Sequence, residues 1–410
     1  MSSESAHQHA AGVDEERGTL PRRSWRQLWL SIHLYLGLFI GALLVILGLT
    51  GSIAVFWAEI DEWLNPELLT VTVPEQKNLA PGAPAYQSLD EIIRVARQAA
   101  APDSRITTVY GARNSEAVYA VYASQPSGAW QRIFVDPYSA RVTGVRSYGA
   151  NEWIPNYFMD AIFQLHFSLL LGMNGQTLMA VCALLLLVSL ITGLIVWWPT
   201  SGQWRKALTI KRGAGPVRFN FDLHKTLSLY LFPVLGAVLL SGVFMNLNEP
   251  FVWVTQLFSP ATRQPQHTLT SIPITGIPSI GAEHAWAIAT KHYPDGKFCG
   301  MFIPGNTEGV YIVTQKHVPK LSAFWSERQI AIDQYSGKIL DVRAPDVRRS
   351  AGETFLEWQW PLHSGQAFGW PGRILIFLCG LACPVIYATG VIRWLQKRRV
   401  KVRSPRHPIR

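Results

Sequence analysis

The chain has 410 residues, of which 49% are hydrophobic and only 16% are charged. Soluble globular domains carry about 25% charged residues, so this composition excludes a fully soluble enzyme. The formal net charge is +10, and the chain contains four cysteines. The positions of the basic residues and cysteines therefore decide whether nucleic acid or disulfides have a role.

Four apolar runs are each long enough to cross the roughly 30 Å hydrocarbon core of a bilayer, and they predict four transmembrane helices. The runs cover residues 28–57, 176–198, 224–247 and 372–394. Lys and Arg gather before the first run, between the second and third, and after the fourth. The positive-inside rule makes these three segments cytoplasmic, and anionic lipid headgroups explain their charge without nucleic acid.

The expected fold is an all-α membrane core that carries two α+β modules on the outer side of the membrane. Each outer segment combines one helix-like stretch with alternating, strand-like runs. The predicted segments are a cytoplasmic tail (1–27), the first span (28–57), outer module 1 (58–157), a pre-span helix with the second span (158–198), a cytoplasmic loop (199–223), the third span (224–247), outer module 2 (248–360), a pre-span segment with the fourth span (361–395) and a basic cytoplasmic tail (396–410).

The two halves of the chain repeat each other at nearly constant spacing, which indicates an internal duplication. His33 and His224 are 191 positions apart, and His166 and His363 are 197 apart. The spacing of 191 also relates Thr50 to Ser241 and Gly51 to Gly242, and that of 197 relates Asp136 to Asp333, Thr192 to Thr389, Gly193 to Gly390 and Trp197 to Trp394. A six-residue insertion in the second outer module reconciles the two spacings.

The duplication gives each half one histidine near the cytoplasmic end of its first span and one near the outer start of its second. Ionisable side chains at membrane depth are costly and usually functional, although a histidine bonded to a neighbouring carbonyl is the structural alternative. A pair of imidazoles is too small a ligand set for zinc, but it can fill both axial positions of a b-type haem. We therefore expect His33 with His224, and His166 with His363, to bind two haems. Small residues on the same helices suit either haem packing or helix packing.

Two haems at opposite faces of the membrane would relay electrons across it. The sequence has no CxxCH motif for covalent haem and no GxGxxG fingerprint after a strand. The predicted cytoplasmic loop is too short for a nicotinamide-binding domain, so a quinol or a separate protein is the expected electron donor.

The assembled motifs resemble the PepSY-associated transmembrane family over about residues 24–400. The resemblance rests on Asp136-Pro-Tyr-Ser-Ala-Arg-Val and Asp333-Gln-Tyr-Ser-Gly-Lys-Ile in the outer modules, and on the segments around the four histidines. It implies an inner-membrane ferric-siderophore reductase that binds haem b through His33, His166, His224 and His363 and delivers electrons to periplasmic iron. Ala140 stands where the family's turn has glycine.

Other groups are weaker candidates. Four tryptophans near the outer edge suit an aromatic platform for a bulky chelate or an ordinary interfacial belt: Trp153, Trp358, Trp360 and Trp370. Glu59, Asp61 and Glu62 are expected to form a solvated boundary, with iron binding as the alternative. Three of the four cysteines lie in apolar runs, so a structural disulfide is not expected.

Two other functions stay open at this stage. One is a non-enzymatic module that is anchored in the membrane and binds a periplasmic protein or peptidase. The other is transport of iron or its chelate, which four helices without paired charges at a broken helix make less favourable.

Overall fold

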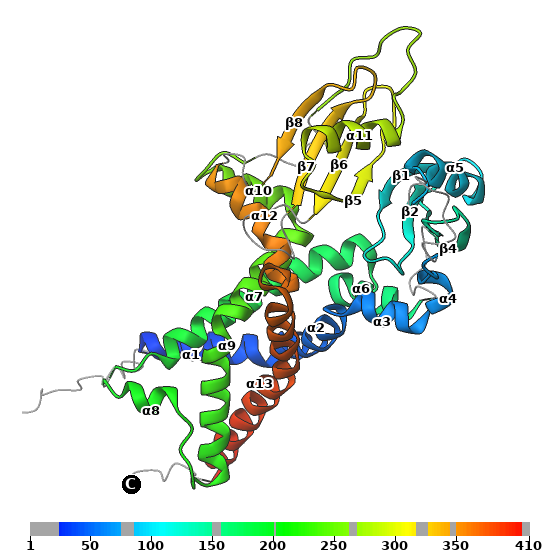
Figure 1. The fold of residues 1–410 in the computed structure, drawn as a ribbon. Coiled ribbons are helices and arrows are strands. Elements are labelled where there is room, and N and C mark those ends of the chain that lie inside the picture. The colour runs from blue at the N-terminus through cyan, green and yellow to red at the C-terminus, as the bar shows by residue number, and fades with distance from the viewer. Residues whose placement is uncertain are drawn as a thin grey trace, which may run out of the picture.

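The computed structural model describes residues 24–74, 86–149, 157–200, 202–261, 269–316, 327–344 and 350–403. Long helices cross one another in one part of the molecule, and a β-sheet lies beyond their upper ends (Figure 1). Three helices in the described ranges are long and apolar enough to cross a membrane: α7 (Gly172–Trp197), α9 (Pro216–Asn246) and α13 (Gly369–Arg403). A fourth crossing results if α1 (Trp25–Phe39) and α2 (Gly41–Ala54) count as one span. The protein is therefore a multi-pass membrane protein.

The first apolar run is bent, whereas the sequence predicts one uninterrupted helix over 28–57. The axes of α1 and α2 meet at Ile40 with a bend of 54°. A Cβ atom on Gly41 would lie only 2.9 Å from the ring of Tyr387, so glycine lets α13 approach closely here. The Tyr387 hydroxyl donates a hydrogen bond of 3.3 Å to the carbonyl of Leu38, next to the bend. A side chain inserted beside the helical hydrogen-bond ladder is a known cause of kinks.

Short helices flank the spans in both halves of the chain. Two follow a span on the sheet side, α3 (Trp57–Leu64) and α10 (Asn248–Gln256), and two precede a span, α6 (Phe158–Ser168) and α12 (Ala351–Ser364). Three shorter helices are α4 (Pro66–Leu69), α8 (Trp204–Leu208) and the 3-10 helix η3 (Gln366–Phe368). α9 begins at Pro216, earlier than the predicted 224, because proline suits the first turn of a helix.

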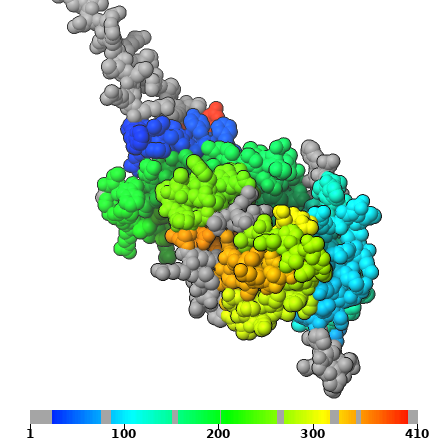
Figure 2. All heavy atoms as spheres, turned by 90° about the horizontal axis from the view of Figure 1, so that it is seen from above, coloured from blue at the N-terminus to red at the C-terminus, as the bar shows by residue number. Residues whose placement is uncertain are grey.

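The strands of the described residues form one antiparallel sheet of eight, in the order β4-β3-β2-β1-β5-β6-β7-β8. The first half contains β1 (Arg105–Tyr110), β2 (Tyr119–Ser124), β3 (Trp130–Val135) and β4 (Val142–Tyr148). The second contains β5 (Lys297–Phe302), β6 (Val310–Lys316), β7 (Glu327–Asp333) and β8 (Ile339–Arg343). The halves join where β1 pairs with β5, and Figure 2 shows them side by side in cyan and yellow to orange. This edge pairing protects two strands that would otherwise expose unpaired backbone groups.

Two helices that pack on one face of the sheet cap each other. Asp90 in α5 (Leu89–Ala99) accepts a hydrogen bond of 2.8 Å from the N–H of Ala282, at the start of α11 (Ala282–His292). Glu283 in α11 accepts one of 2.7 Å from the N–H of Leu89, at the start of α5. Carboxylates at helix N-termini satisfy free N–H groups and oppose the positive end of the helix dipole. A buried apolar core between α5, α11 and the sheet completes this side.

The turns after β3 and β7 have the same construction. Asp136 accepts hydrogen bonds from the N–H of Tyr138 and the hydroxyl of Ser139, and Asp333 accepts the same two bonds from Tyr335 and Ser336. The following residue has a positive φ in both turns, 54° at Ala140 and 69° at Gly337. The alanine therefore adopts the left-handed conformation that glycine adopts without steric cost.

Candidate paired-histidine sites

The structure brings the four predicted histidines together as two pairs. His33 on α1 faces His224 on α9, with ring centroids 6.4 Å apart. His166 on α6 faces His363 on α12, with centroids 6.0 Å apart. Each pair takes one imidazole from each half of the chain, as the spacing of the sequence predicts.

Hydrogen bonds to Nδ1 determine the tautomer of three of the rings directly. The Nδ1 atom of His33 lies 2.9 Å from the carbonyl oxygen of residue 189. The Nδ1 atom of His224 lies 3.0 Å from the carbonyl oxygen of residue 386, and that of His363 lies 3.1 Å from the carbonyl oxygen of residue 238. A carbonyl oxygen can only accept, so Nδ1 carries the hydrogen in all three. Each Nε2 atom is then left with a free lone pair, the form in which histidine binds a metal ion.

The fourth ring, His166, reaches the same state through a hydroxyl. Its Nδ1 atom lies 3.0 Å from Oγ1 of Thr50, and this hydroxyl donates its own hydrogen to the carbonyl of Ile46 at 2.7 Å. The hydroxyl oxygen therefore accepts from Nδ1–H. A hydroxyl also lies near Nδ1 of each of the other three rings. The distances are 3.5 Å from Ser189 to His33, 3.1 Å from Thr389 to His224 and 2.9 Å from Ser241 to His363.

A glycine lies against each imidazole. A Cβ atom added to Gly51 would lie 2.9 Å from the Cε1 atom of His166, and one added to Gly193 would lie 2.9 Å from the Cε1 atom of His33. The corresponding distances are 3.2 Å from Gly390 to His224 and 3.6 Å from Gly242 to His363. The first two contacts are too short for alanine, so glycine allows the ring to lie flat against the neighbouring helix.

The distance between the rings suits one metal ion held from opposite sides. Such an arrangement places ring centroids about 6 Å apart, because each metal–nitrogen bond is about 2 Å and each centroid lies about 1 Å beyond its nitrogen. No group of three or more His, Cys, Asp or Glu side chains that could hold a metal ion occurs among the residues that the structure describes. The donor set of each pair is therefore two imidazoles, which fits the two axial positions of haem iron better than a tetrahedral zinc ion.

The space and the polar groups beside the His33–His224 pair also suit a flat cofactor. Gly37, one helical turn beyond His33, has no atom within 4 Å of the position that a Cβ would occupy. Two buried polar groups have no hydrogen-bond partner in the part of the chain that the structure describes. They are the hydroxyl of Ser228, one turn beyond His224, and the indole N–H of Trp29. Buried polar groups without partners are uncommon in folded proteins, and they indicate a ligand or water that completes the site.

The second pair opens into a large cavity of about 1640 Å³. The cavity extends from His166 and His363 between the spans to the face of the sheet opposite α5 and α11, and its walls include Arg132, Lys316 and Glu327. Lys316 and Glu327 form an ion pair of 3.7 Å. Burial raises the pKa of the Glu327 carboxyl, and Lys316 opposes this shift. The cavity therefore offers apolar walls with paired charges to a bulky molecule next to the histidine pair.

Only part of the predicted tryptophan platform borders this cavity. Trp358 and Trp360 line it. Trp370 instead stacks on Phe56 at 6.2 Å, with the guanidinium of Arg373 above its ring at 4.6 Å. The fourth residue of that prediction, Trp153, lies outside the described residues.

The prediction of a solvated acidic boundary is wrong for Asp61. Its carboxylate is buried and accepts bonds of 2.7 and 2.9 Å from Arg146, whose side chain is fully buried on β4. Arg146 also contacts Asp160 on α6 at 3.3 Å. Glu59 pairs with Arg373 at 2.9 Å. The sequence could not show this, because Arg146 lies 85 positions from Asp61. The cluster fixes the sheet to α3 and to the helix that carries His166.

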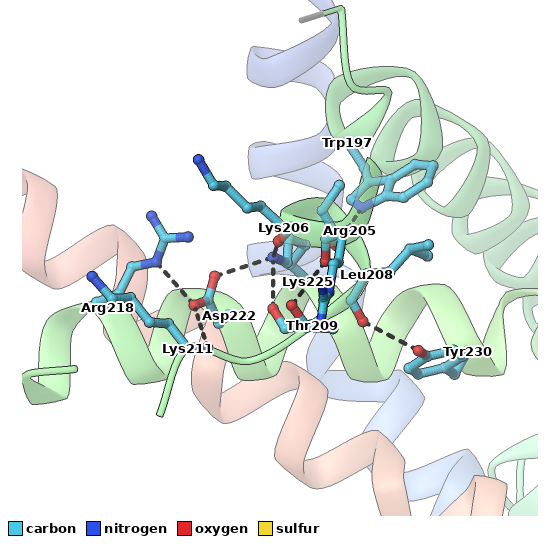
Figure 3. Close-up of polar contacts among 11 residues, drawn as sticks. Trp197, Arg205, Lys206, Leu208, Thr209, Lys211, Arg218, Asp222, Lys225 and Tyr230 are labelled. Carbon is cyan, nitrogen blue, oxygen red and sulfur yellow. Dashed lines mark hydrogen bonds and ion pairs between the residues drawn. The ribbon is translucent and has the colours of Figure 1, made fainter. Parts of the chain in front are cut away.

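At the opposite end of the bundle, α8 is tied to α9 beside His224 (Figure 3). The Nζ atom of Lys225 donates to the carbonyls of Lys206 and Thr209 at 2.8 and 3.3 Å, and it contacts Asp222 at 3.1 Å. Asp222 also accepts a bond of 2.9 Å from Arg218. These contacts hold the start of α9 in place and so fix the depth of His224.

Comparison with known families identifies this architecture. The family model of the PepSY-associated TM region matches residues 30–397. The chain belongs to the PepSY-associated transmembrane family. None of the curated proteins compared with the chain matches it. Membership of this family accounts for the membrane helices, and the pairing of histidines is a property of this chain's own geometry.

Proposed function

We propose that this PepSY-associated transmembrane protein is a haem b oxidoreductase of the bacterial inner membrane, which passes electrons outward to reduce a ferric siderophore in the periplasm. The observation that carries the proposal is the pairing of four Nδ1-bonded imidazoles, each with a free Nε2 lone pair, at two levels of a helix bundle. In this proposal the sheet lies in the periplasm, and both termini lie in the cytoplasm with the basic residues.

Equivalent contacts in the two halves support a duplicated core of four spans. His33 bonds to residue 189 and lies against Gly193, while His224 bonds to residue 386 and lies against Gly390. The histidines are 191 positions apart and their partners 197 apart, as in the repeat of the sequence. A duplicated ancestor with one histidine at each end of its helix pair explains why the two halves of each site are built alike.

Bound haem b would supply one-electron redox chemistry at each site. The residues of the chain would hold and orient it: His33 and His224 at the cytoplasmic level, and His166 and His363 at the periplasmic level. The bonds to Nδ1 hold each ring in one orientation with its hydrogen on Nδ1, and they raise its basicity as a ligand. Buried apolar residues of α7 and α9, among them Leu186 and Leu239, pack together in the helix bundle.

The cavity beside His166 and His363 would hold the ferric chelate as substrate. Each ferric ion takes up one electron and becomes ferrous, and a quinol or a separate donor protein supplies the electrons from the opposite side. Hard oxygen ligands hold the ferrous ion more weakly, so reduction loosens the iron. The paired charges of the cavity and its tryptophans, Trp358 and Trp360, suit a bulky chelate of low net charge.

Reconstitution into lipid vesicles tests this function. Vesicles receive a lipid-soluble quinol and an external ferric hydroxamate chelate, and an external ferrous indicator reports reduction. His33→Ala and His166→Ala should abolish reduction, whereas His284→Ala, at an exposed position on α11, should match the unmodified protein. Reduction at the normal rate by His166→Ala would contradict the proposal, and it would favour the alternative of an anchored module that binds a periplasmic protein.

A further inference from the structure

The indole N–H of Trp29 is a buried donor without a partner beside the His33–His224 pair. Its nitrogen is shielded from solvent, and no acceptor of the described residues lies within hydrogen-bonding distance of it. Leaving a buried donor unpaired is unfavourable, because the donor has lost its hydrogen bonds to water. An indole N–H can only donate, so the missing partner is an acceptor.

The position of Trp29 places this donor at the edge of the proposed cofactor site. Trp29 and His33 are four residues apart on α1, so their side chains share one face of the helix. The equivalent position in the second half is Asn220, which is 191 residues later. The amide of Asn220 already donates to the carbonyl of Thr389 at 2.9 Å. These two equivalent positions therefore differ: the amide of Asn220 has a partner, whereas the indole N–H of Trp29 has none among the described residues.

We propose that the indole N–H of Trp29 donates to a carboxylate of the haem that His33 and His224 hold, and that it orients this carboxylate edge toward the cytoplasmic end of α1. The inference rests on the proposed function. A haem b molecule carries two carboxylates, and an ionised carboxylate away from water needs hydrogen-bond donors. Arg26, one turn before Trp29, places positive charge at the same end of the helix.

The contact makes Trp29 a positioning residue that also sets the redox potential of one haem. A donor to the carboxylate offsets part of its negative charge near the iron, which favours ferrous over ferric iron. Trp29→Phe keeps the aromatic ring and removes only the N–H. This variant should therefore retain both haems and lower the midpoint potential of one of them. It should also release that haem about tenfold faster to a haem-scavenging protein, since a charge-assisted hydrogen bond contributes about 1.4 kcal/mol or more.

Spectroelectrochemistry of the purified full-length protein, with two controls, tests the contact. The first control is Trp25→Phe, because Trp25 is 70% exposed and packs edge-on against Trp29 without this donor role. The second is reconstitution with haem dimethyl ester, which lacks ionised carboxylates. The esterified haem should abolish the difference in potential between the unmodified protein and Trp29→Phe, and the potential that moves should belong to the haem that His33→Ala loses.

The outcomes separate this inference from the proposed function. If both haems are bound and Trp29→Phe leaves their potentials and release rates unchanged, the inference is overturned and the haem function stands. A difference that persists with the esterified haem would also overturn it, because the carboxylate would not be the partner. An unmodified protein that binds no haem would overturn both.

Discussion

Replacing Asp61 by asparagine should destabilise the outer part of the protein strongly. Arg146 has no exposed side-chain surface, and Asp61 accepts two of its hydrogen bonds, at 2.7 and 2.9 Å. Breaking a buried ion pair by removing one partner costs about 3–5 kcal/mol, because the other charge stays buried. Asp160 remains 3.3 Å from Arg146 and compensates in part. We therefore expect the lower end of this range, about 3 kcal/mol, for Asp61→Asn.

Thermal unfolding in mild detergent, followed by tryptophan fluorescence, measures the effect. A domain of about 200 residues loses roughly 2–4 °C in Tm for each kcal/mol, which predicts a decrease of about 6–12 °C. The matched control is Glu91→Gln, which breaks an exposed ion pair with Arg94 on α5 and should leave Tm unchanged.

A double variant tests the physical reason for this prediction. Asp61→Leu with Arg146→Met removes both charges and fills similar volume, so it should be more stable than Asp61→Asn alone. If Asp61→Asn unfolded at the same temperature as the Glu91→Gln control, the buried pair would not hold the sheet to the membrane helices, and the reasoning would be refuted.

Three further predictions concern the turns and the histidine sites. Ala140→Gly should raise stability by about 1 kcal/mol, because it relieves a left-handed alanine, whereas Gly337→Ala should lower it by at least as much in the same thermal assay. Burial alone raises the pKa of the Asp333 carboxyl, but the hydrogen bonds of its turn lower it more, so its pKa is below the usual value. The stability it contributes is present at neutral pH and is lost as pH falls below about 4, so Asp333→Asn should flatten this part of the profile of Tm against pH. Gly51→Ala should displace His166 and lower the ratio of haem to protein in a pyridine haemochrome assay. Gly242→Ala should keep the normal ratio, because its Cβ atom would lie 0.7 Å farther from the ring of His363 than that of Gly51→Ala from the ring of His166.

The membrane helices and the pairing of histidines could be predicted from sequence for clear physical reasons. Apolar runs of sufficient length leave the backbone no alternative to helices in a bilayer. The constant spacing between the two halves relates each histidine to its counterpart, and the structure places these same residues face to face. The hydroxyls at Thr50, Ser241 and Thr389 belong to the same repeat, so their roles could have been found from it.

Other features depend on contacts between distant segments and leave no local pattern. The bend at Ile40 arises from the approach of Tyr387, nearly the whole chain away. The carbonyls that bind Nδ1 are backbone groups, which no residue type marks. The joining of β1 to β5 depends on two strand edges that lie in different halves of the chain. Asp61 resembled a surface carboxylate because its partner on β4 could not be identified from spacing.

The absorption spectrum of the purified protein tests the central claim most directly. The protein is purified in mild detergent after expression with added haem, and spectra are recorded in the oxidised and dithionite-reduced states together with the ratio of haem to protein. The account predicts low-spin b-type spectra with about two haems per chain, and the loss of one haem in His33→Ala and of the other in His363→Ala. A colourless protein, or variants that keep the full haem content, would contradict the claim that these histidine pairs hold haem.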